Sequence, residues 1–494
     1  MHDDERLRQE LCLLPVPDHG RDYRKRREAV LAAAAPLTQE QAHPLTAPGE
    51  RRRRPISRRM LIIAAAAAVC LAAVVLGVVF STARNSGGTE AGSAPSLSQA
   101  GPGRTLTGDA PHVVGDDLTG MVRGLDGEIW AWGYRQPRSS PGKPVLERWD
   151  GQSWQAVPAP AGEIAGVAAL SSADLWIAEN TRRGGQLTHW DGATWTAFPA
   201  ISFARTTDTS NALLALSPSD IWAVGWAESS GAGTLKRSRL TTLHWDGRSW
   251  SSVPAPAFGR GIGKVSLRLI RGVSPDAVWA LGDYRRYRRT TASGKVDWVP
   301  VGSTQFLLFW DGRRWTRQPW PTSQLSSGAK DGIAINDLAV TSDGELWCAG
   351  SRWFGLHNTS DLWVPIVLRL QAGRWQVMAS SATPSLPADW KQFISNSISL
   401  TSSQDVWVAG GIRTDSSLWH WDGSAWSVVT LGRAQSTNWL FTRSVFAVAA
   451  NDVWVLTERA TASDTRIQLE PFFVHFDGVA WRRVPAAPSA GAQR

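Results

Sequence analysis

Two tyrosines and four arginines stand close together in one short segment, at Tyr284, Tyr287 and within the run from Arg285 to Arg289. A tyrosine nucleophile with an acidic partner, and arginines around a substrate carboxylate, are the groups that cleave an acidic sugar. Such a site needs groups that converge from several elements, whereas these come from a single segment. The cluster therefore predicts a binding surface rather than a catalytic centre.

Basic and aromatic residues are also mixed in the segments before and after this cluster, and we expect all three segments to be loops. Guanidinium groups beside aromatic rings suit a protein, an anionic glycan or a lipid head group. The alternative is that the loops are only solvated. The candidate binding residues are Lys236, Arg237, Arg285, Arg286, Tyr287, Arg288, Arg289, Arg352, Trp353 and Trp363.

Histidine is the other residue type that could carry chemistry. His189, His244, His420 and His475 each precede the aromatic residue of a repeated motif. Equivalent positions in different repeats point away from one another, so they cannot converge on one metal ion. We expect them to be repeated strand residues. Because no phosphate-binding glycine loop, nucleophile elbow or H-E-x-x-H pattern is present, we expect neither a metal nor a cofactor.

Two short motifs alternate seven times from residue 113 onward and account for most of the 28 tryptophans. The first is an acidic residue shortly before a tryptophan, and it ends at Trp130, Trp176, Trp222, Trp279, Trp347, Trp407 and Trp454. The second is W-D-G-x-x-W, at 149–154, 190–195, 245–250, 310–315 and 421–426, with a variant at 476–481 and a degenerate copy at 370–375. Asp-Gly predicts a tight two-residue hairpin turn.

Each pair of motifs predicts four antiparallel strands, the size of one propeller blade. We therefore expect an all-β fold over residues 113–488, a seven-bladed β-propeller with the repeated tryptophans packed between neighbouring blades. Neither end of this region has an obvious spare strand, so we expect closure by packing of the first blade on the last. Residues 105–114 are the one candidate for an added edge strand.

These motifs resemble the W-D-G-repeat β-propellers of bacterial secreted and membrane proteins, called kelch-like or sialidase-like in a loose sense. The sialidase hairpin has S-x-D-x-G-x-x-W, whereas here aspartate directly precedes glycine, as in Asp150-Gly151. A kelch-type double glycine occurs only at Gly410-Gly411. The resemblance implies the fold, but such propellers include enzymes, lectins and scaffolds, so it implies no single activity.

Leu61 to Phe80 is a run of twenty residues without a charge, long enough to cross a membrane as one helix. Six arginines precede it between Arg51 and Arg59, which predicts a cytoplasmic tail (1–60) and an extracytoplasmic C-terminal part. This arrangement explains the net charge of +9 without nucleic acid. The alternative is a cleaved signal peptide, but sixty residues make an unusually long leader. Residues 81–112 predict a flexible linker rich in Gly, Ser and Pro.

The tail is expected to be mostly disordered, with room for one short helix. Residues 11–19 and the basic stretch after them resemble cytoplasmic segments of actinobacterial membrane proteins associated with sigma factors. That resemblance implies a sigma-factor-related cytoplasmic partner, and the alternative is a solvated tail.

The sequence predicts a membrane-anchored, non-enzymatic module that binds, senses or scaffolds through its propeller. The alternative is a propeller glycosidase or lyase that acts on an acidic polysaccharide. The central channel distinguishes the two hypotheses. Convergent carboxylates and arginines at its mouth would favour the enzyme, and an apolar mouth would favour the binding module.

Overall fold

A computed structural model describes residues 112–136, 143–181, 184–198, 212–229, 237–259, 262–292, 295–321, 331–354, 363–380, 394–412, 415–433, 438–462 and 466–488. The expected tail, membrane segment and nearly all of the linker lie outside these residues. Within them, no helix has the length and apolar character needed to span a bilayer.

Every regular element of the described residues is a β-strand, and the strands form seven successive groups of four, which we call repeats one to seven. Repeats one to three contain β1 (His112–Arg123), β2 (Ile129–Gln136), β3 (Lys143–Trp149), β4 (Trp154–Val157), β5 (Glu163–Ser171), β6 (Asp174–Thr181), β7 (Gly184–Trp190), β8 (Trp195–Phe198), β9 (Leu213–Ser217), β10 (Asp220–Ser229), β11 (Arg237–Trp245) and β12 (Trp250–Ser252). Repeats four and five contain β13 (Ile262–Ser274), β14 (Ala277–Ala292), β15 (Lys295–Trp310), β16 (Trp315–Gln318), β17 (Asp331–Val340), β18 (Leu346–Phe354), β19 (Trp363–Gln371) and β20 (Arg374–Ser380). Repeats six and seven contain β21 (Ile394–Ser402), β22 (Asp405–Ile412), β23 (Asp415–Trp421), β24 (Trp426–Arg433), β25 (Asn438–Ala449), β26 (Asp452–Ala462), β27 (Arg466–Phe476) and β28 (Trp481–Pro485).

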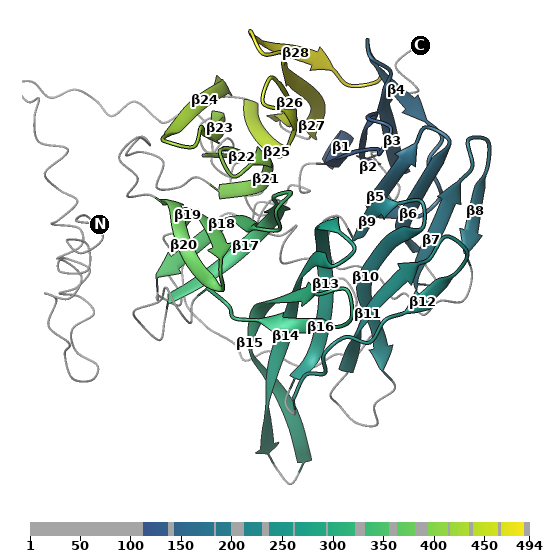
Figure 1. The fold of residues 1–494 in the computed structure, drawn as a ribbon, viewed down its shortest axis with the longest axis vertical. Coiled ribbons are helices and arrows are strands. Elements are labelled where there is room, and N and C mark those ends of the chain that lie inside the picture. The colour runs from purple at the N-terminus through teal and green to yellow at the C-terminus, as the bar shows by residue number, and fades with distance from the viewer. Residues whose placement is uncertain are drawn as a thin grey trace, which may run out of the picture. The chain divides into compact units, whose positions relative to one another are not determined.

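The repeats form a β-propeller. Five of them are separate four-stranded antiparallel sheets in chain order, and repeats seven and one join in a single eight-stranded sheet. The first strands of successive repeats contact one another around a ring, in the order β1, β5, β9, β13, β17, β21, β25 and back to β1. Figure 1 shows these strands around a common centre, with the fourth strands toward the periphery.

The ring closes through backbone pairing as well as packing. The first four residues of β1, His112–Gly115, pair in parallel with Arg466–Leu469 of β27, so the first strand extends across the last repeat. The expectation that closure rests on packing alone was therefore wrong. The candidate edge strand at 105–114 is confirmed for residues 112–114, and residues 105–111 lie outside the described part of the chain. We call this junction of repeats seven and one the closure seam.

Inner strands share a β-bulge that links neighbouring repeats. One extra residue stands against the second strand in six repeats, and these residues are Thr119, Ala165, Arg268, Asn336, Asn396 and Arg443. A bulge disrupts the ladder and redirects a side chain. Three of these six side chains donate to backbone carbonyls of the next repeat: Arg268 to Ile335 (2.5 Å), Asn336 to Ser395 (2.7 Å) and Asn396 to Thr442 (2.9 Å).

The repeated tryptophans pack between neighbouring repeats, as the sequence predicted. At three junctions the tryptophan that ends the first motif contacts both aromatics of the second motif in the following repeat. Trp222 lies with its ring centroid 5.0 Å from that of Trp310 and 5.5 Å from that of Trp315. The same contact crosses the closure seam, where Trp454 lies 4.7 Å from Trp149 and 5.8 Å from Trp154.

The W-D-G turn differs from the predicted two-residue turn. Its ladder ends at the pair Trp149 and Trp154, which leaves a four-residue loop. The carboxylate of Asp150 accepts hydrogen bonds from two backbone amides of that loop, both at 2.8 Å, and only Gly151 has a positive φ. The aspartate caps the loop, so one positive φ is enough. A true two-residue turn occurs in the degenerate copy, where Ala372 and Gly373 both have positive φ.

Each of the four histidines pairs with the aspartate of the first motif in its own repeat, as expected for a repeated strand residue. The imidazole Nε2 lies 2.8 to 2.9 Å from a carboxylate oxygen in every pair. The rings also pack on the first-motif tryptophan, most closely for His420 on Trp407, whose centroids are 3.8 Å apart. The pairs are His189–Asp174, His244–Asp220, His420–Asp405 and His475–Asp452.

The other repeats replace both members of this pair together. Repeat five has Glu345 and Arg369 at 2.5 Å, and repeat one has the equivalent Glu128 and Arg148 at 3.5 Å. Repeat four has no charge at either position, where Ala277 and Phe309 stand. In repeats one and five the longer acid accompanies the longer base, whereas the shorter aspartate accompanies histidine in repeats two, three, six and seven.

This pairing predicts a compensating exchange in repeat six. Asp405→Glu and His420→Arg alone should each lower the free energy of unfolding by about 1 kcal/mol, because a misfitted partner leaves half-buried polar groups unpaired. The double variant should recover most of that loss. The measurement is urea unfolding followed by tryptophan fluorescence. The control is the mismatched double variant Asp405→Glu/His475→Arg, in which the two losses of unfolding free energy should simply add. If the matched and mismatched double variants lose the same unfolding free energy, the pairing is contradicted.

Candidate binding face and central cavity

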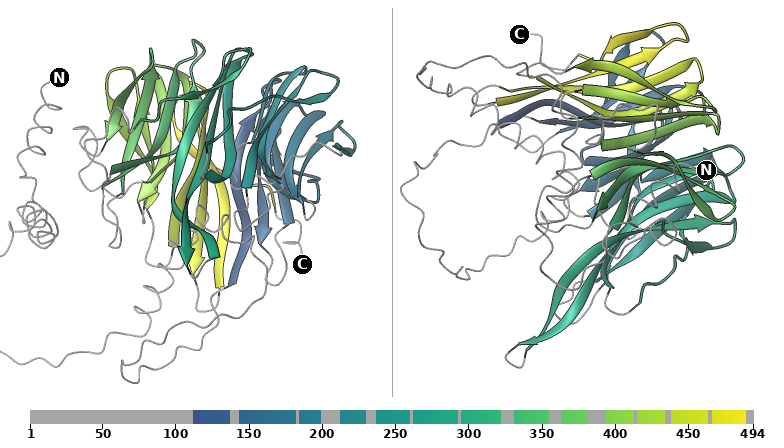
Figure 2. Two further views of the ribbon diagram at one scale, coloured as in Figure 1. Left: turned by 90° about the horizontal axis from the view of Figure 1, so that it is seen from below. Right: turned by 90° about the vertical axis from the view of Figure 1, so that its left-hand side faces the viewer.

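The segment that holds Arg285 to Arg289 is a long β-hairpin, which corrects the prediction of a loop. β14 and β15 have 16 residues each and remain paired from Val278 and Trp310 to Ala292 and Lys295. β13 accompanies β14 only to Arg286, so the ribbon is two-stranded beyond that residue. It projects past the neighbouring sheets (Figures 1 and 2). The β-branched and aromatic residues of 296–301 were the overlooked strand signal.

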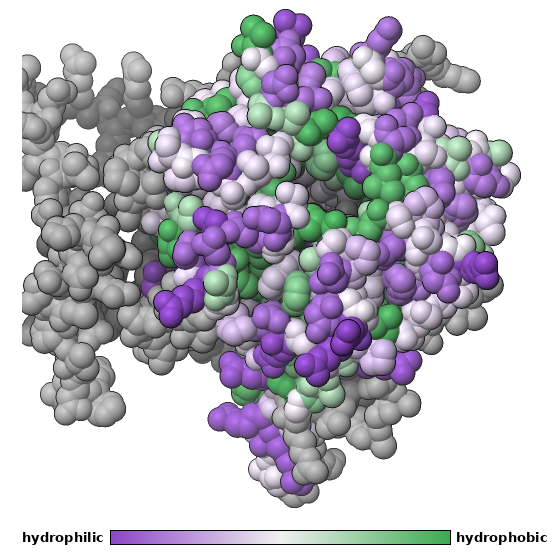
Figure 3. All heavy atoms as spheres, viewed as in Figure 1, coloured by the Kyte–Doolittle hydropathy of each residue, from purple (hydrophilic) through white to green (hydrophobic). Residues whose placement is uncertain are grey.

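The outer part of this hairpin presents cations beside apolar surface. Arg286, Arg288 and Arg289 are exposed, whereas Arg285 and Tyr287 are half-buried. On the partner strand, Val299 and Val301 are exposed to 40% and 47%. Figure 3 shows hydrophilic surface along the hairpin. We call Arg286, Arg288 and Arg289 the basic ribbon.

The remaining predicted residues lie on the repeats on either side. Arg237 begins β11 in repeat three, and Lys236 lies outside the described residues. Arg352 and Trp353 belong to β18 in repeat five, where Trp353 pairs with Trp363 of β19. These positions are strand ends rather than loops. They share the end of the propeller opposite the W-D-G turns, because strands alternate in direction within each repeat.

Tyr284, a candidate catalytic tyrosine in the sequence, is engaged in packing. Its ring lies 5.4 Å from Phe258, and the guanidinium of Arg317 lies 5.3 Å from the ring centroid. Beside it, at the base of the hairpin, opens a pocket of about 370 Å³ lined by Gln305, Phe306, Arg317, Gln318, Pro319 and Trp320. Tyr284 and Tyr287 therefore do not meet around a central site.

A central cavity of about 250 Å³ is lined by three or four residues from each of the seven inner strands. Figure 3 shows the hollow with hydrophobic surface around it. The lining is mostly aliphatic, and its charged residues are Arg123, Arg271 and Asp337. Sequence patterns did not reveal these three, because nothing in their local sequence distinguishes them from other strand residues.

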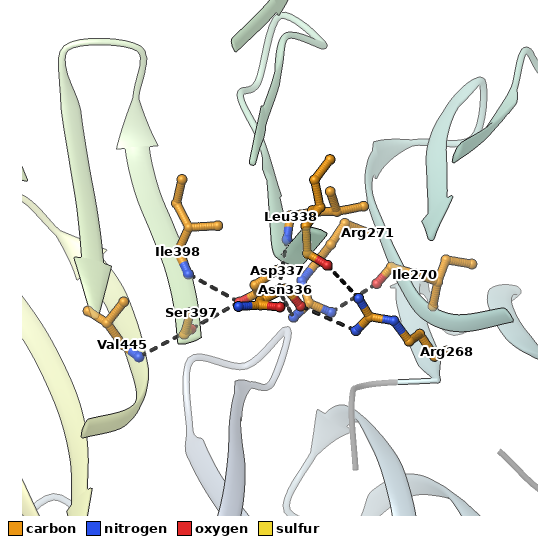
Figure 4. A network of polar contacts seen from close by, with 10 residues as sticks. Arg268, Ile270, Arg271, Asn336, Asp337, Leu338, Ser397, Ile398 and Val445 are labelled. Carbon is orange, nitrogen blue, oxygen red and sulfur yellow. Dashed lines mark hydrogen bonds and ion pairs between the residues drawn. The ribbon is translucent and has the colours of Figure 1, made fainter. Parts of the chain in front are cut away.

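Asp337 is fully occupied by structural bonds (Figure 4). One carboxylate oxygen accepts from Arg271 at 3.0 Å and from its neighbour's amide at 2.9 Å. The other accepts from the Ser397 hydroxyl at 2.9 Å and the Ile398 amide at 3.1 Å. The ion pair joins repeats four and five, and the bonds from Ser397 and Ile398 join repeat six to them. A carboxylate with four donors is poorly suited to act as a general base.

A second polar cluster lies at the closure seam, on the side of the propeller that carries the hairpin. Arg443 contacts Glu458 at 2.8 Å and Asp117 at 3.5 Å, and Tyr134 is next to Asp117. These are the residue types of an acidic-sugar hydrolase, at a place the sequence did not indicate. Burial and the nearby Asp117 carboxylate, however, raise the pKa of the Tyr134 hydroxyl strongly. Tyr134 therefore keeps its proton and does not supply a tyrosinate nucleophile.

A scan against protein-family models and a search of the curated proteins find no match. Among solved structures, a polysaccharide lyase described as a PL25 ulvan lyase is 12% identical, with a TM-score of 0.49 over 77% of this chain and 100% of that one. YCF48 bound to a D1 peptide is 13% identical, with a TM-score of 0.41 over 76% and 94%. The β-propeller domain of the Trilobed protease from Pyrococcus furiosus is 10% identical, with a TM-score of 0.40 over 74% and 97%. Similarity of this size concerns the fold and says nothing of activity.

The bonds of Asp337 predict a large structural effect. Asp337→Ala should lower the free energy of unfolding by about 2–4 kcal/mol, because it leaves two buried backbone amides, a buried hydroxyl and the half-buried Arg271 without their acceptor. Asp276→Ala, which removes an exposed carboxylate from the same propeller, should change it by no more than about 0.5 kcal/mol. Urea unfolding of both variants provides the comparison, and similar losses in the two would show that Asp337 is not a structural link.

Proposed function

We propose that the chain is a single-pass membrane protein that holds a seven-bladed β-propeller outside the cytoplasm, where the propeller binds an anionic glycan or protein without chemical turnover. The anchor is Leu61–Phe80 and the tail 1–60 is cytoplasmic, where a sigma-factor-related partner fits its sequence. The basic ribbon carries this proposal. Three exposed guanidinium groups lie within four residues, on a hairpin that extends beyond its sheet.

Electrostatics favours an anionic ligand at this ribbon. Like charges at such spacing repel one another, and an anion placed among them relieves that repulsion. Guanidinium groups also form strong, often bidentate hydrogen bonds with carboxylates, sulfates and phosphates. Exposed Val299 and Val301 add apolar contact area on the same hairpin.

The enzyme alternative has fewer supporting observations. Asp337 is fully bonded, Tyr284 is packed among aromatic rings, and Tyr134 holds its proton. A lyase or glycosidase would need a free base or nucleophile beside a substrate cleft. Incubation of the protein with acidic polysaccharides tests this alternative, and release of shortened chains would favour it over the binding module.

Binding should depend on the basic ribbon. Replacement of Arg286, Arg288 and Arg289 by Ser should leave the free energy of unfolding within about 0.5 kcal/mol, because exposed charges contribute little to folding. The same change should weaken binding to heparin, an anionic glycan probe, by at least about tenfold at low salt. The wild-type affinity should fall as salt screens the contacts.

The control is a variant with the same loss of charge at the other end of the propeller. Arg248, Arg313 and Arg314 are exposed in W-D-G turns, and their replacement by Ser should leave heparin binding nearly unchanged. If both triple variants lose affinity equally, net charge rather than the basic ribbon determines binding. If neither loses affinity, the proposed site is wrong.

A further inference from the structure

The closure seam contains more buried acid than base. Four carboxyl groups lie there, and each is at most 9% exposed: Asp116, Asp117, Glu147 and Glu458. They come from β1, β3 and β26, and the arginines that pair with them are Arg135 of β2 and Arg443 of β25. The acids and arginines separate into two groups on the two faces of β1, because Asp116 and Asp117 are successive strand residues.

In the first group, one arginine is committed to one of two acids. Arg135 donates to both carboxylate oxygens of Asp116, at 2.5 and 2.9 Å. Glu147 is 2% exposed and accepts a hydrogen bond at 3.1 Å from the amide of Ala487, which follows β28. Among the described residues, no cation lies within ion-pair distance of Glu147. Glu147 therefore has no ion pair of its own, and the charge of Arg135 acts on it only from a longer distance.

In the second group, one arginine is shared between two acids. Arg443 lies between Asp117 and Glu458, and Glu458 is 1% exposed. Tyr134, whose hydroxyl keeps its proton, stands beside Asp117, and Glu163 of β5 adds another negative charge in the vicinity. One oxygen each of Asp117 and Glu458 is buried without a hydrogen-bond partner. The group therefore has one negative charge in excess if both acids ionise.

A buried, uncompensated carboxylate is unfavourable, and the group takes a proton instead. Burial raises the pKa of Glu147 to about 7. Burial, helped by the charge of Asp117 and opposed by Arg443, raises the pKa of Glu458 to about 8. These directions agree with the charge balance of the two groups.

We propose that the closure seam is a proton-binding site that takes up two protons, one on Glu147 and one on the Asp117–Glu458 pair, and loosens when it loses them. The residues that would move first are His112–Gly115. They directly precede Asp116 on β1, and their parallel pairing with β27 contains only four residues. This site is independent of the basic ribbon. It makes the attachment of the first strand sensitive to mild alkalinity.

The sign of the effect follows from the two protonation equilibria. In the unfolded chain both glutamates titrate near their ordinary range of about 4.3, whereas in the folded chain they hold protons up to pH values near 7 and 8. The folded state therefore binds more protons in this window. Its extra stability is fully present at acidic pH and is lost as the pH rises through these values.

The first test is urea unfolding of the full chain between pH 5.5 and 9. All tryptophans follow residue 129, so their fluorescence reports the propeller alone. The unfolding equilibrium constant of the wild type should rise with pH by up to about tenfold per unit for each proton bound. The double variant Glu147→Gln/Glu458→Gln should lose this part of the slope and be the more stable form at pH 8.5. An identical slope in both proteins would overturn the proposal.

The second test uses the wild type and does not depend on folding of the variants. Only every second amide of His112–Gly115 can face β27, so the probe is the protected amide of Val113 or Val114. Its hydrogen exchange, corrected for intrinsic rates, should show at least tenfold more opening at pH 8.5 than at pH 6. The internal control is the amide of Ile398, which bonds to Asp337 at another junction and should not change. Equal protection of this amide at both pH values would contradict the loosening of the seam.

Discussion

The packing of one tryptophan per repeat against the next repeat is the contact on which the rest of the structure depends. A four-stranded sheet has two faces and cannot bury both by itself. Each first-motif tryptophan buries roughly 150–250 Å² between neighbouring sheets, and edge-to-face arrangement with the closing aromatic adds specificity. Because Trp454 makes this contact with Trp149 and Trp154, the last junction repeats the geometry of the others and the ring can close.

Periodic features were predictable from the sequence, and features that occur once were not. The motifs located all seven repeats, and the histidines were recognised as strand residues because they recur. The partners of Asp337 lie about 60 residues away in other repeats, and Glu147 meets Ala487 across 340 residues, so no local pattern indicates either contact. The hairpin of β14 and β15 was predicted as a loop, because that prediction rested on its cations and not on its β-branched residues.

Polar groups in this propeller fall into two classes with different consequences. Several of those at bulges and in the central cavity bond across repeats and connect the inner strands, as Arg268, Asn336 and Asp337 do. Those of the basic ribbon are exposed and available to a ligand. The closure seam belongs to neither class, because its acids are buried but exceed its arginines. The proposed binding function rests on the exposed cations of the ribbon, and the proposed proton uptake rests on the excess of buried acid at the seam.

The central claim is that the tryptophan contact at the junction of repeats seven and one is equivalent to that at an internal junction. A double-mutant cycle with Trp454→Phe and Trp154→Phe measures its coupling free energy directly, and Trp222→Phe with Trp315→Phe supplies the internal reference. We expect similar couplings of about 0.5–1.5 kcal/mol at both junctions. Additive losses for Trp454 and Trp154, together with clear coupling for Trp222 and Trp315, would contradict a ring closed by this contact.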